Sequence, residues 1–455
     1  MSGMSDIDVE RPAVLTTVKG RRGIRRILAP LGGTTMLADC LVALRYLSSP
    51  HRLVQGPAIA EFEQAFARRI GVRCACSFSS GRVGLYGLLR ALDVGPGDEV
   101  LLQVPTHIVV ANAIRYVRAR PVYVDCRLDT YNMDLEQAEQ RISRRTKVLL
   151  LQHTFGIPVD LDAALALARK HRLVVIEDCV HALGATYGGR PVGSFGRAAF
   201  FSTEETKTIS TTMGGMVVTD DPELAARVQA FQASCAWPSR SLVAGNLLKL
   251  VALHLLMHPH IHGYARALYH LVGEPHPLPR ATSAADLRGG LKPSNYEQRL
   301  SNAQAALGLR QLQRLDANLC HRRTVAKASG AMLAARGFDL PQPPAGAEPA
   351  FVRYPVWVEN RAAAVRLAAP HAVLGLWFTS VLEEAISPVY GDYAMGTCPR
   401  AEAAAQHLIN LPTHPRVSVR DLEAVISAIT RWPESGVQKS EELLARAARF
   451  NAEHF

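Results

Sequence analysis

A chain of 455 residues, of which 48% are hydrophobic, is long enough to bury the cores of two domains, and this composition argues against disorder. No run of about 18 uncharged apolar residues occurs, so no membrane span is expected, and the start lacks the apolar core of a signal peptide. The formal net charge of +11 favours acidic ligands. The eight cysteines lack zinc-like spacing, so we expect reduced thiols, a cytoplasmic protein and no metal site.

Residues 1–30 are interpreted as a basic extension, because lysine and arginine residues gather between Lys19 and Arg26. A solvated tail explains this cluster better than nucleic-acid binding, since no interleaved aromatic residues accompany it. A helix is expected over 36–47. Apolar residues that recur at three- and four-residue steps predict a second helix over 56–70.

Short apolar segments then alternate with helical patterns, which predicts a largely parallel, doubly wound sheet. Strands are expected over 74–78, 99–104, 121–125, 148–151, 173–176, 198–201 and 215–218, and helices over 83–92, 135–142, 161–171 and 224–231. Ser80, Gly81 and Arg82 lie between the first of these strands and its helix. Because the amides of a helix N-terminus point outward, this turn is a candidate phosphate site.

An acid and a lysine follow two of the expected strands. The apolar run 173–176 leads into Glu177 and Asp178, and the run 198–201 leads into Ser202, with Lys207 five residues later. Alone, each has an ordinary explanation, a turn or cap for Asp178 and a solvated surface for Lys207. Ligands of open α/β sheets bind beyond the carboxyl ends of the strands. Together the two residues fit a pyridoxal phosphate (PLP) site, with Asp178 at the pyridine nitrogen and Lys207 as the Schiff-base lysine.

The order of these residues resembles the DegT/DnrJ/EryC1/StrS family of PLP-dependent sugar aminotransferases, which share fold type I with aspartate aminotransferase. The residues that carry the resemblance are Glu177-Asp178, His181, Leu183-Gly184-Ala185, Gly193-Ser194-Phe195-Gly196, Ser202, Lys207 and Gly214-Gly215. It covers residues 54–231 well and 293–432 moderately. It implies an α/β large domain with a mostly parallel seven-stranded sheet and a smaller α/β C-terminal domain.

The resemblance also implies roles for single residues. Lys207 would hold PLP and move the proton, and Asp178 would keep the pyridine nitrogen protonated. His181 would contact the 3-oxygen of the ring. Gly81 and Ser202 would bind the phosphate.

At three positions the chain departs from the family pattern. Arg82 replaces a small hydroxyl residue beside the phosphate, where its guanidinium can serve as a ligand, and His107 replaces the aromatic residue that stacks on the ring. Asn295 corresponds to the residue that reaches the PLP of the neighbouring subunit, so the resemblance implies a homodimer with shared active sites. Two extra residues stand between Asn295 and the matching Arg299.

The expected organisation is a basic extension (1–30), a large PLP-binding domain (31–231), an apolar insert (232–292) and a linking helix with the small domain (293–455). Within the insert, residues 242–257 predict a helix, for which packing inside the protein is favoured over membrane-surface binding. His153 is interpreted as structural. A helix over 303–323, a strand over 350–358 and a helix over 419–429 follow.

The resemblance implies an aminotransferase that moves an amino group from an amino acid, L-glutamate in the family, to a keto group of a nucleotide-linked sugar, as in aminosugar biosynthesis. Two alternatives stay open. The acceptor is an aminocyclitol or another non-nucleotide carbonyl compound, or the protein is a non-catalytic PLP-binding regulator whose insert binds a membrane or a partner. Intact Asp178 and Lys207 weigh against the last alternative.

Overall fold

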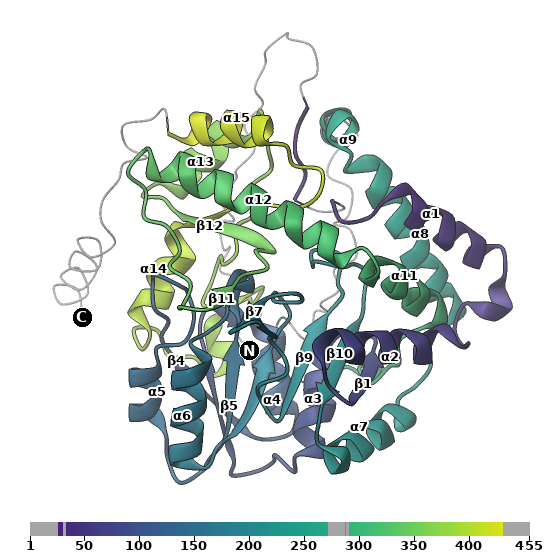
Figure 1. Cartoon of the computed structure of the whole chain (residues 1–455), viewed down its shortest axis with the longest axis vertical. Helices are drawn as coiled ribbons and strands as arrows, with labels where there is room; N and C mark the ends of the chain where they lie inside the picture. Colours follow the sequence, from purple (N-terminus) through teal and green to yellow (C-terminus); the bar gives the residue numbers. More distant parts are fainter. Residues whose placement is uncertain (1–25, 31–32, 272–286, 288–290, 431–455) are drawn as a thin grey trace, which may run out of the picture.

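A large domain built on one sheet lies beside a smaller C-terminal domain, and the long helix α12 (Leu315–Ala334) runs between them (Figure 1). The computed structural model describes residues 26–30, 33–271, 287 and 291–430.

The sheet of the large domain has seven strands in the order β1-β10-β9-β6-β5-β2-β4. Only β10 runs against the others, because β1 and β9 both pair with it in antiparallel fashion while the remaining pairs are parallel. The fold class expected from the sequence is therefore confirmed. The strands are β1 (Cys74–Phe78), β2 (Glu99–Gln103), β4 (Arg120–Val124), β5 (Thr146–Gln152), β6 (Val174–Asp178), β9 (Ala198–Ser202) and β10 (Gly215–Thr219).

Helices cover both faces of this sheet, because alternate strand residues point to opposite sides. Leu150 and Ile176 belong to one core, with α3 (Gly81–Ala91), α4 (Ile108–Tyr116) and α7 (Pro222–Ser234). Leu149 and Val175 belong to the other, with α2 (Ala58–Ile70), α5 (Leu135–Arg141) and α6 (Leu161–His171).

The C-terminal domain packs helices on a small antiparallel sheet of β12 (Arg353–Trp357) and β14 (Leu408–Pro412). Its helices include α13 (Arg361–Ala368), α14 (Pro399–His407) and α15 (Val419–Ile429). Leu28, which we expected in the solvated extension, is fully buried in this domain's core and forms a bridge with Ala372. The rest of that extension, residues 1–25, lies outside the described residues.

The single helix expected over 303–323 is wrong. Two helices, α11 (Asn302–Leu312) and α12, replace it, with Gln313 and Arg314 between them. Arg314 leaves helical geometry, and its guanidinium binds the buried carboxylate of Asp39, with one contact at 2.8 Å. This ion pair joins residues far apart in the sequence, so the pattern of apolar residues around Arg314 does not reveal the break between the two helices.

The insert contains α8 (Arg240–Leu256), which lies beside α1 (Leu37–Leu47) in Figure 1, and α9 (Pro259–Leu271), which contacts α8. Val243, Leu247 and Leu250 of α8 are buried against α1 and α11, so one face packs inside the protein as favoured above. Other leucines of α8, among them Leu248, are exposed. Among the described helices none alone is long and apolar enough to cross a membrane; α8 and residues 259–268 pass that test only as a pair bent by 103°.

Candidate active site

Asp178 lies at the carboxyl end of β6, next to Phe200 of β9 in the sheet register. Its side chain is buried, and one carboxylate oxygen accepts the Val180 N–H at 3.1 Å. Burial raises the pKa of Asp178 to about 6, against the opposing effects of the Val180 N–H and the charge of Lys207. A cation placed beside Asp178 would favour its charged form.

Lys207 is buried rather than solvated, with only 7% of its surface exposed. Its Nζ lies 4.4 Å from the ring centre of Trp377, and its carbonyl oxygen accepts the hydroxyl of Thr34 at 3.3 Å. Burial lowers the pKa of Lys207 to about 8, although Glu204 and Asp178 act in the other direction. The neutral, nucleophilic amine is therefore reached as the pH rises through about 8, well below the ordinary lysine value of 10.5.

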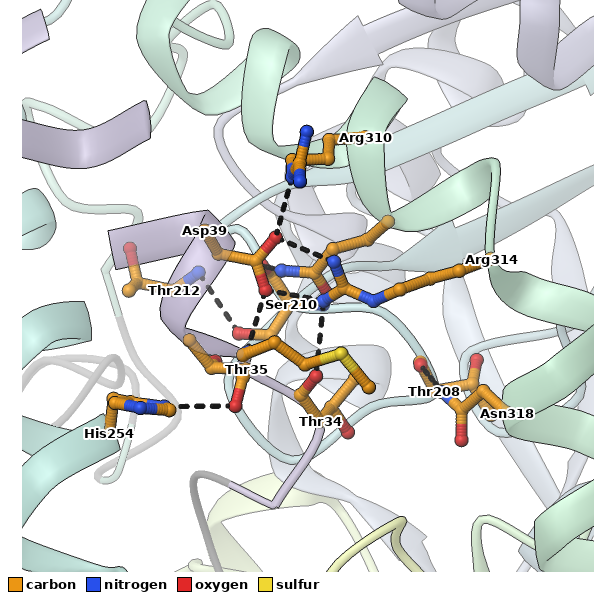
Figure 2. Close-up of polar contacts among 12 residues, drawn as sticks. Thr34, Thr35, Asp39, Thr208, Ser210, Thr212, His254, Arg310, Arg314 and Asn318 are labelled. Atoms are coloured by element: carbon orange, nitrogen blue, oxygen red, sulfur yellow. Dashed lines mark hydrogen bonds and ion pairs between the residues drawn. The ribbon is translucent and has the colours of Figure 1, made fainter. Parts of the chain in front are cut away.

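The loop that carries Lys207 is held by elements far away in the sequence (Figure 2). Asn318 of α12 donates to the carbonyl oxygen of Thr208 at 2.6 Å. Arg314 binds the carbonyl oxygen of Thr34 at 3.2 Å, in addition to Asp39. The insert takes part as well, since Nδ1 of His254 lies 3.0 Å from the carbonyl oxygen of Thr35 (Figure 2). These anchoring residues could not be predicted from local sequence, because each contact joins distant segments.

His181 has one ring nitrogen bound and one unsatisfied. Its Nδ1 accepts the Phe155 N–H at 3.3 Å, and its ring centre lies 4.7 Å from that of Trp377. Burial, followed by the charges of Lys207 and Arg353, holds the pKa of His181 well below its usual value, so the ring is neutral. A neutral imidazole that accepts at Nδ1 carries its proton on Nε2. That nitrogen is buried and has no partner among the described residues, so it is a donor in need of an acceptor.

A second unsatisfied group marks the turn between β1 and α3. Ser80 precedes α3 with extended backbone, and its hydroxyl is buried without a partner in the described part of the chain. A Cβ on Gly81 would lie 3.4 Å from that of Ser202, and a Cβ on Gly215 would lie 2.3 Å from the Gly81 nitrogen. The two glycines therefore let the ends of three strands meet the N-terminus of α3, where anions are favoured. The sequence indicated the turn that contains Ser80 as a candidate phosphate site but assigned no separate role to its hydroxyl.

His107 lies beside this group of residues with both ring nitrogens engaged. Its Nδ1 accepts the Val109 N–H at 3.3 Å, which caps α4, and its Nε2 lies 3.4 Å from the carboxylate of Glu384. It interacts electrostatically with both Asp178 and His181, so it lies near both. The stacking role given to His107 stays a prediction.

Arg82 contacts Tyr296, and Asn295 is the residue before Tyr296 in the chain. The guanidinium carbon of Arg82 is 5.7 Å from the ring centre of Tyr296, whose hydroxyl donates to the Arg82 carbonyl oxygen at 3.0 Å. Asn295 is exposed, and the structure does not bring it together with Asp178 and Lys207 of its own chain. Its contact with a neighbouring subunit stays a prediction.

His153 has the structural role expected for it. It is fully buried, its Nε2 lies 3.2 Å from the carboxylate of Glu177, and its Nδ1 accepts the Val159 N–H at 3.1 Å. Glu177 in turn accepts the backbone N–H groups of Gly193, Phe195 and Gly196. These two residues thus hold the turn of residues 193–196, which precedes β9, in place.

Comparisons with known proteins identify one family for this chain. The DegT/DnrJ/EryC1/StrS aminotransferase family model matches residues 39–250 and 267–430. GDP-perosamine synthase of Caulobacter vibrioides is 32% identical over 379 residues, which cover 82% of this chain and 90% of the relative. UDP-N-acetyl-3-dehydro-alpha-D-glucosamine 3-aminotransferase of Acidithiobacillus ferrooxidans is 30% identical over 363 residues, covering 79% and 84%.

A solved structure is similar along most of its length. DesV of S. venezuelae superposes with a TM-score of 0.68 at 28% identity, covering 88% of this chain and 95% of that protein. The fold and the matched residues lead to one conclusion: the chain belongs to the DegT/DnrJ/EryC1/StrS aminotransferase family.

Proposed function

We propose that the protein is a PLP-dependent aminotransferase that moves an amino group from an amino-acid donor, L-glutamate, to a keto group of a nucleotide-linked sugar. The observation that carries this proposal is the buried Lys207, with a pKa of about 8, in the same environment as the buried carboxylate of Asp178.

The unsatisfied groups of the site fit PLP. Nε2 of His181 is a buried donor that suits the 3-oxygen of the cofactor, and the Ser80 hydroxyl at the start of α3 suits its phosphate, with Gly81 and Ser202 alongside. Asp178 fits a contact with the protonated pyridine nitrogen. Its buried carboxylate would there gain a positively charged partner, which would stabilise its charged form.

The residues divide the work as follows. PLP, when bound, supplies an electron sink for the carbon that bears the amino group. Lys207 would hold the cofactor and, once displaced by the donor, would take the proton from that carbon at its Nζ and deliver it to the cofactor, for which a pKa near 8 is well matched. Asp178 keeps the pyridine nitrogen protonated, and His181 orients the ring.

The substrate class rests on the relatives. Two curated relatives have names that specify a GDP-linked and a UDP-linked sugar, and the net charge of +11 suits a diphosphate. The proposed assembly is a homodimer with shared active sites in the cytoplasm.

An absorbance spectrum of the purified protein, followed by addition of L-glutamate, tests this function. We expect a band near about 420 nm for bound PLP, which shifts toward about 330 nm when the donor is added. Lys207→Ala should lack the first band, whereas Lys327→Ala, at an exposed position of α12, should retain it. If no band forms even after PLP is added, the proposal is wrong.

The acceptor is tested next with the aminated form of the protein. A nucleotide-linked keto sugar should restore the band near about 420 nm, and a keto-cyclitol should not. Restoration by the cyclitol alone would replace the sugar with the non-nucleotide acceptor.

A further inference from the structure

Arg353 is a desolvated cation to which the described part of the chain offers no hydrogen-bond acceptor. It begins β12 and is partly buried, and burial lowers its pKa to about 10. Glu204 and Glu383 act on its charge, but neither is in ion-pair contact with it. Arginine side chains largely removed from water are normally paired, so the partly buried guanidinium of Arg353 has donors that an entering anion can use.

Arg322 provides the contrast, because it lines the same small cavity of about 20 Å³ and makes four hydrogen bonds within the protein. Its guanidinium donates to Asn318 at 2.9 Å, to the carbonyl oxygen of Val352 at 3.0 Å, and to the hydroxyls of Thr413 and Thr34 at 3.0 and 3.1 Å. Arg322 is therefore structural. Of the two arginines at the cavity, Arg353 is the one with donors left for a ligand.

Trp377 places Arg353 beside Lys207. The guanidinium carbon of Arg353 lies 4.3 Å from the indole ring centre, and Nζ of Lys207 lies 4.4 Å from the same centre. The two cations are therefore at most about 9 Å apart. Gly375 leaves room for the guanidinium, since a Cβ there would lie 3.0 Å from its Nη1.

The distance between the guanidinium of Arg353 and Nζ of Lys207 favours one of the anionic groups that the two substrates carry. In an α-amino acid the carboxylate carbon is two bonds of about 1.5 Å from the amino nitrogen, so a guanidinium near Lys207 can reach it. The diphosphate of a nucleotide-linked sugar is separated from the reacting carbon by the sugar ring, which places it farther away. A carboxylate also matches the planar fork of a guanidinium with two parallel hydrogen bonds.

We propose that Arg353 binds the α-carboxylate of the amino donor, with Trp377 as the residue that holds the guanidinium in position. The inference rests on the proposed function. It makes Arg353 a determinant of donor recognition, and the same contact receives the carboxylate of the keto acid that leaves.

Binding of 2-oxoglutarate to the PLP-loaded protein tests the contact without turnover, because this keto acid has no amino group to transfer. Calorimetry should show that Arg353→Gln weakens binding by about 10- to 100-fold, as expected when a charged hydrogen-bonded pair is lost. Arg353→Lys keeps the positive charge but not the two parallel donors of a guanidinium. Its affinity for 2-oxoglutarate should lie between those of the unaltered protein and Arg353→Gln. Arg366→Gln, at an exposed position of α13, should bind like the unaltered protein.

Donor amides provide the second measurement. The unaltered protein should react with L-glutamate at far lower concentrations than with its α-amide, and Arg353→Gln should remove most of that preference while the KM for the sugar acceptor stays within about twofold.

Unchanged 2-oxoglutarate binding in Arg353→Gln with its band near about 420 nm intact would overturn the inference and leave the proposed function standing. If Arg353→Gln weakened only the binding of the sugar acceptor, the inference would be overturned and the proposed function would stand. If the unaltered protein lacked the band, both the inference and the proposed function would be wrong.

Discussion

At the scale of single residues, burial moves the pKa values of Lys207 and Asp178 toward neutrality. The amine of Lys207 titrates near 8 and the carboxyl of Asp178 near 6, in both cases chiefly because the charged form is desolvated. Between these values the acid is charged and the lysine is still mostly protonated. The site therefore gains a nucleophilic amine only as the pH rises through about 8.

This titration predicts how the cofactor-free protein takes up PLP. Only the neutral amine attacks the aldehyde, so the attachment rate should rise about tenfold per pH unit up to about 8 and level off above it. Borohydride trapping at each pH, with quantification of the modified Lys207 peptide, measures the rate. A rate that keeps rising to about pH 10 would show an ordinary lysine.

The residues that carry chemistry were largely predictable, because they follow strand ends in a fixed order. Asp178, His181, Gly81, Ser202 and Lys207 are brought to one region, as the motif spacing indicated. Arg353 and Trp377 were not predictable, since the first looks like any strand residue and the second like any loop aromatic. Their significance comes from what surrounds them in the fold, which local sequence does not specify.

At the scale of elements, Asp39 joins the start of α1 to the break between α11 and α12. Its side chain is fully buried, accepts the Met36 N–H at 2.8 Å and pairs with Arg314. Asp39→Ala leaves Arg314 without this partner, so we expect a loss of about 3 kcal/mol in the free energy of unfolding. Denaturant unfolding measures it.

The matched control is Asp316→Ala, which removes an exposed ion pair with Arg69 and should cost less than about 1 kcal/mol. Equal losses in the two variants would mean that the Asp39 pair does not organise this junction.

Two glycines give opposite predictions for the same substitution. Gly215→Ala would place a methyl group 2.3 Å from the Gly81 nitrogen, so it should lower stability by about 1–3 kcal/mol and weaken PLP binding. Gly245→Ala lies within α8, where a Cβ meets nothing within 4 Å, and should raise stability by about 0.5–1 kcal/mol. Thermal unfolding with and without PLP separates the effects. Similar behaviour of both variants would contradict the close approach at Gly215.

Most elements were predictable from periodicity and capping residues. The strand 74–78 and the helices 161–171 and 419–429 have the expected bounds, and the helix expected over 135–142 begins at the residue after its cap, Asp134. The helix over 303–323 was wrong for a reason that periodicity cannot report. The helix is interrupted at Arg314, whose guanidinium binds the side chain of Asp39, more than 270 residues away in the chain.

At the scale of the whole molecule, His414 ties the N-terminal segment to the C-terminal domain. Its Nε2 lies 2.9 Å from the carbonyl oxygen of Ala29, and burial lowers its pKa to about 4 from an ordinary value of 6.5. Because the folded pKa is the lower one, the stability it contributes is present above pH 6.5 and is lost as the pH falls toward 4.

We therefore expect the free energy of unfolding to fall by up to about 3 kcal/mol from this residue between pH 6.5 and 4. Urea unfolding of the cofactor-free protein at both pH values measures this fall in the free energy of unfolding. The fall should be smaller in His414→Gln, because glutamine stays neutral. The same pH dependence in both proteins would assign the effect to other groups.

The single reversed strand of the sheet has a consequence for how the chain folds during synthesis. Within the seven-stranded sheet β1 pairs only with β10, and Phe78 faces Gly215, which is made 137 residues later. The strand that leads into the Ser80 turn therefore leaves the ribosome long before its neighbour exists. Pairing over such a distance is slow and leaves a strand edge open in the meantime. Ribosome-bound chains that end before residue 215 should lack a protected β1, and chaperones that cover apolar edges are expected to act in this interval.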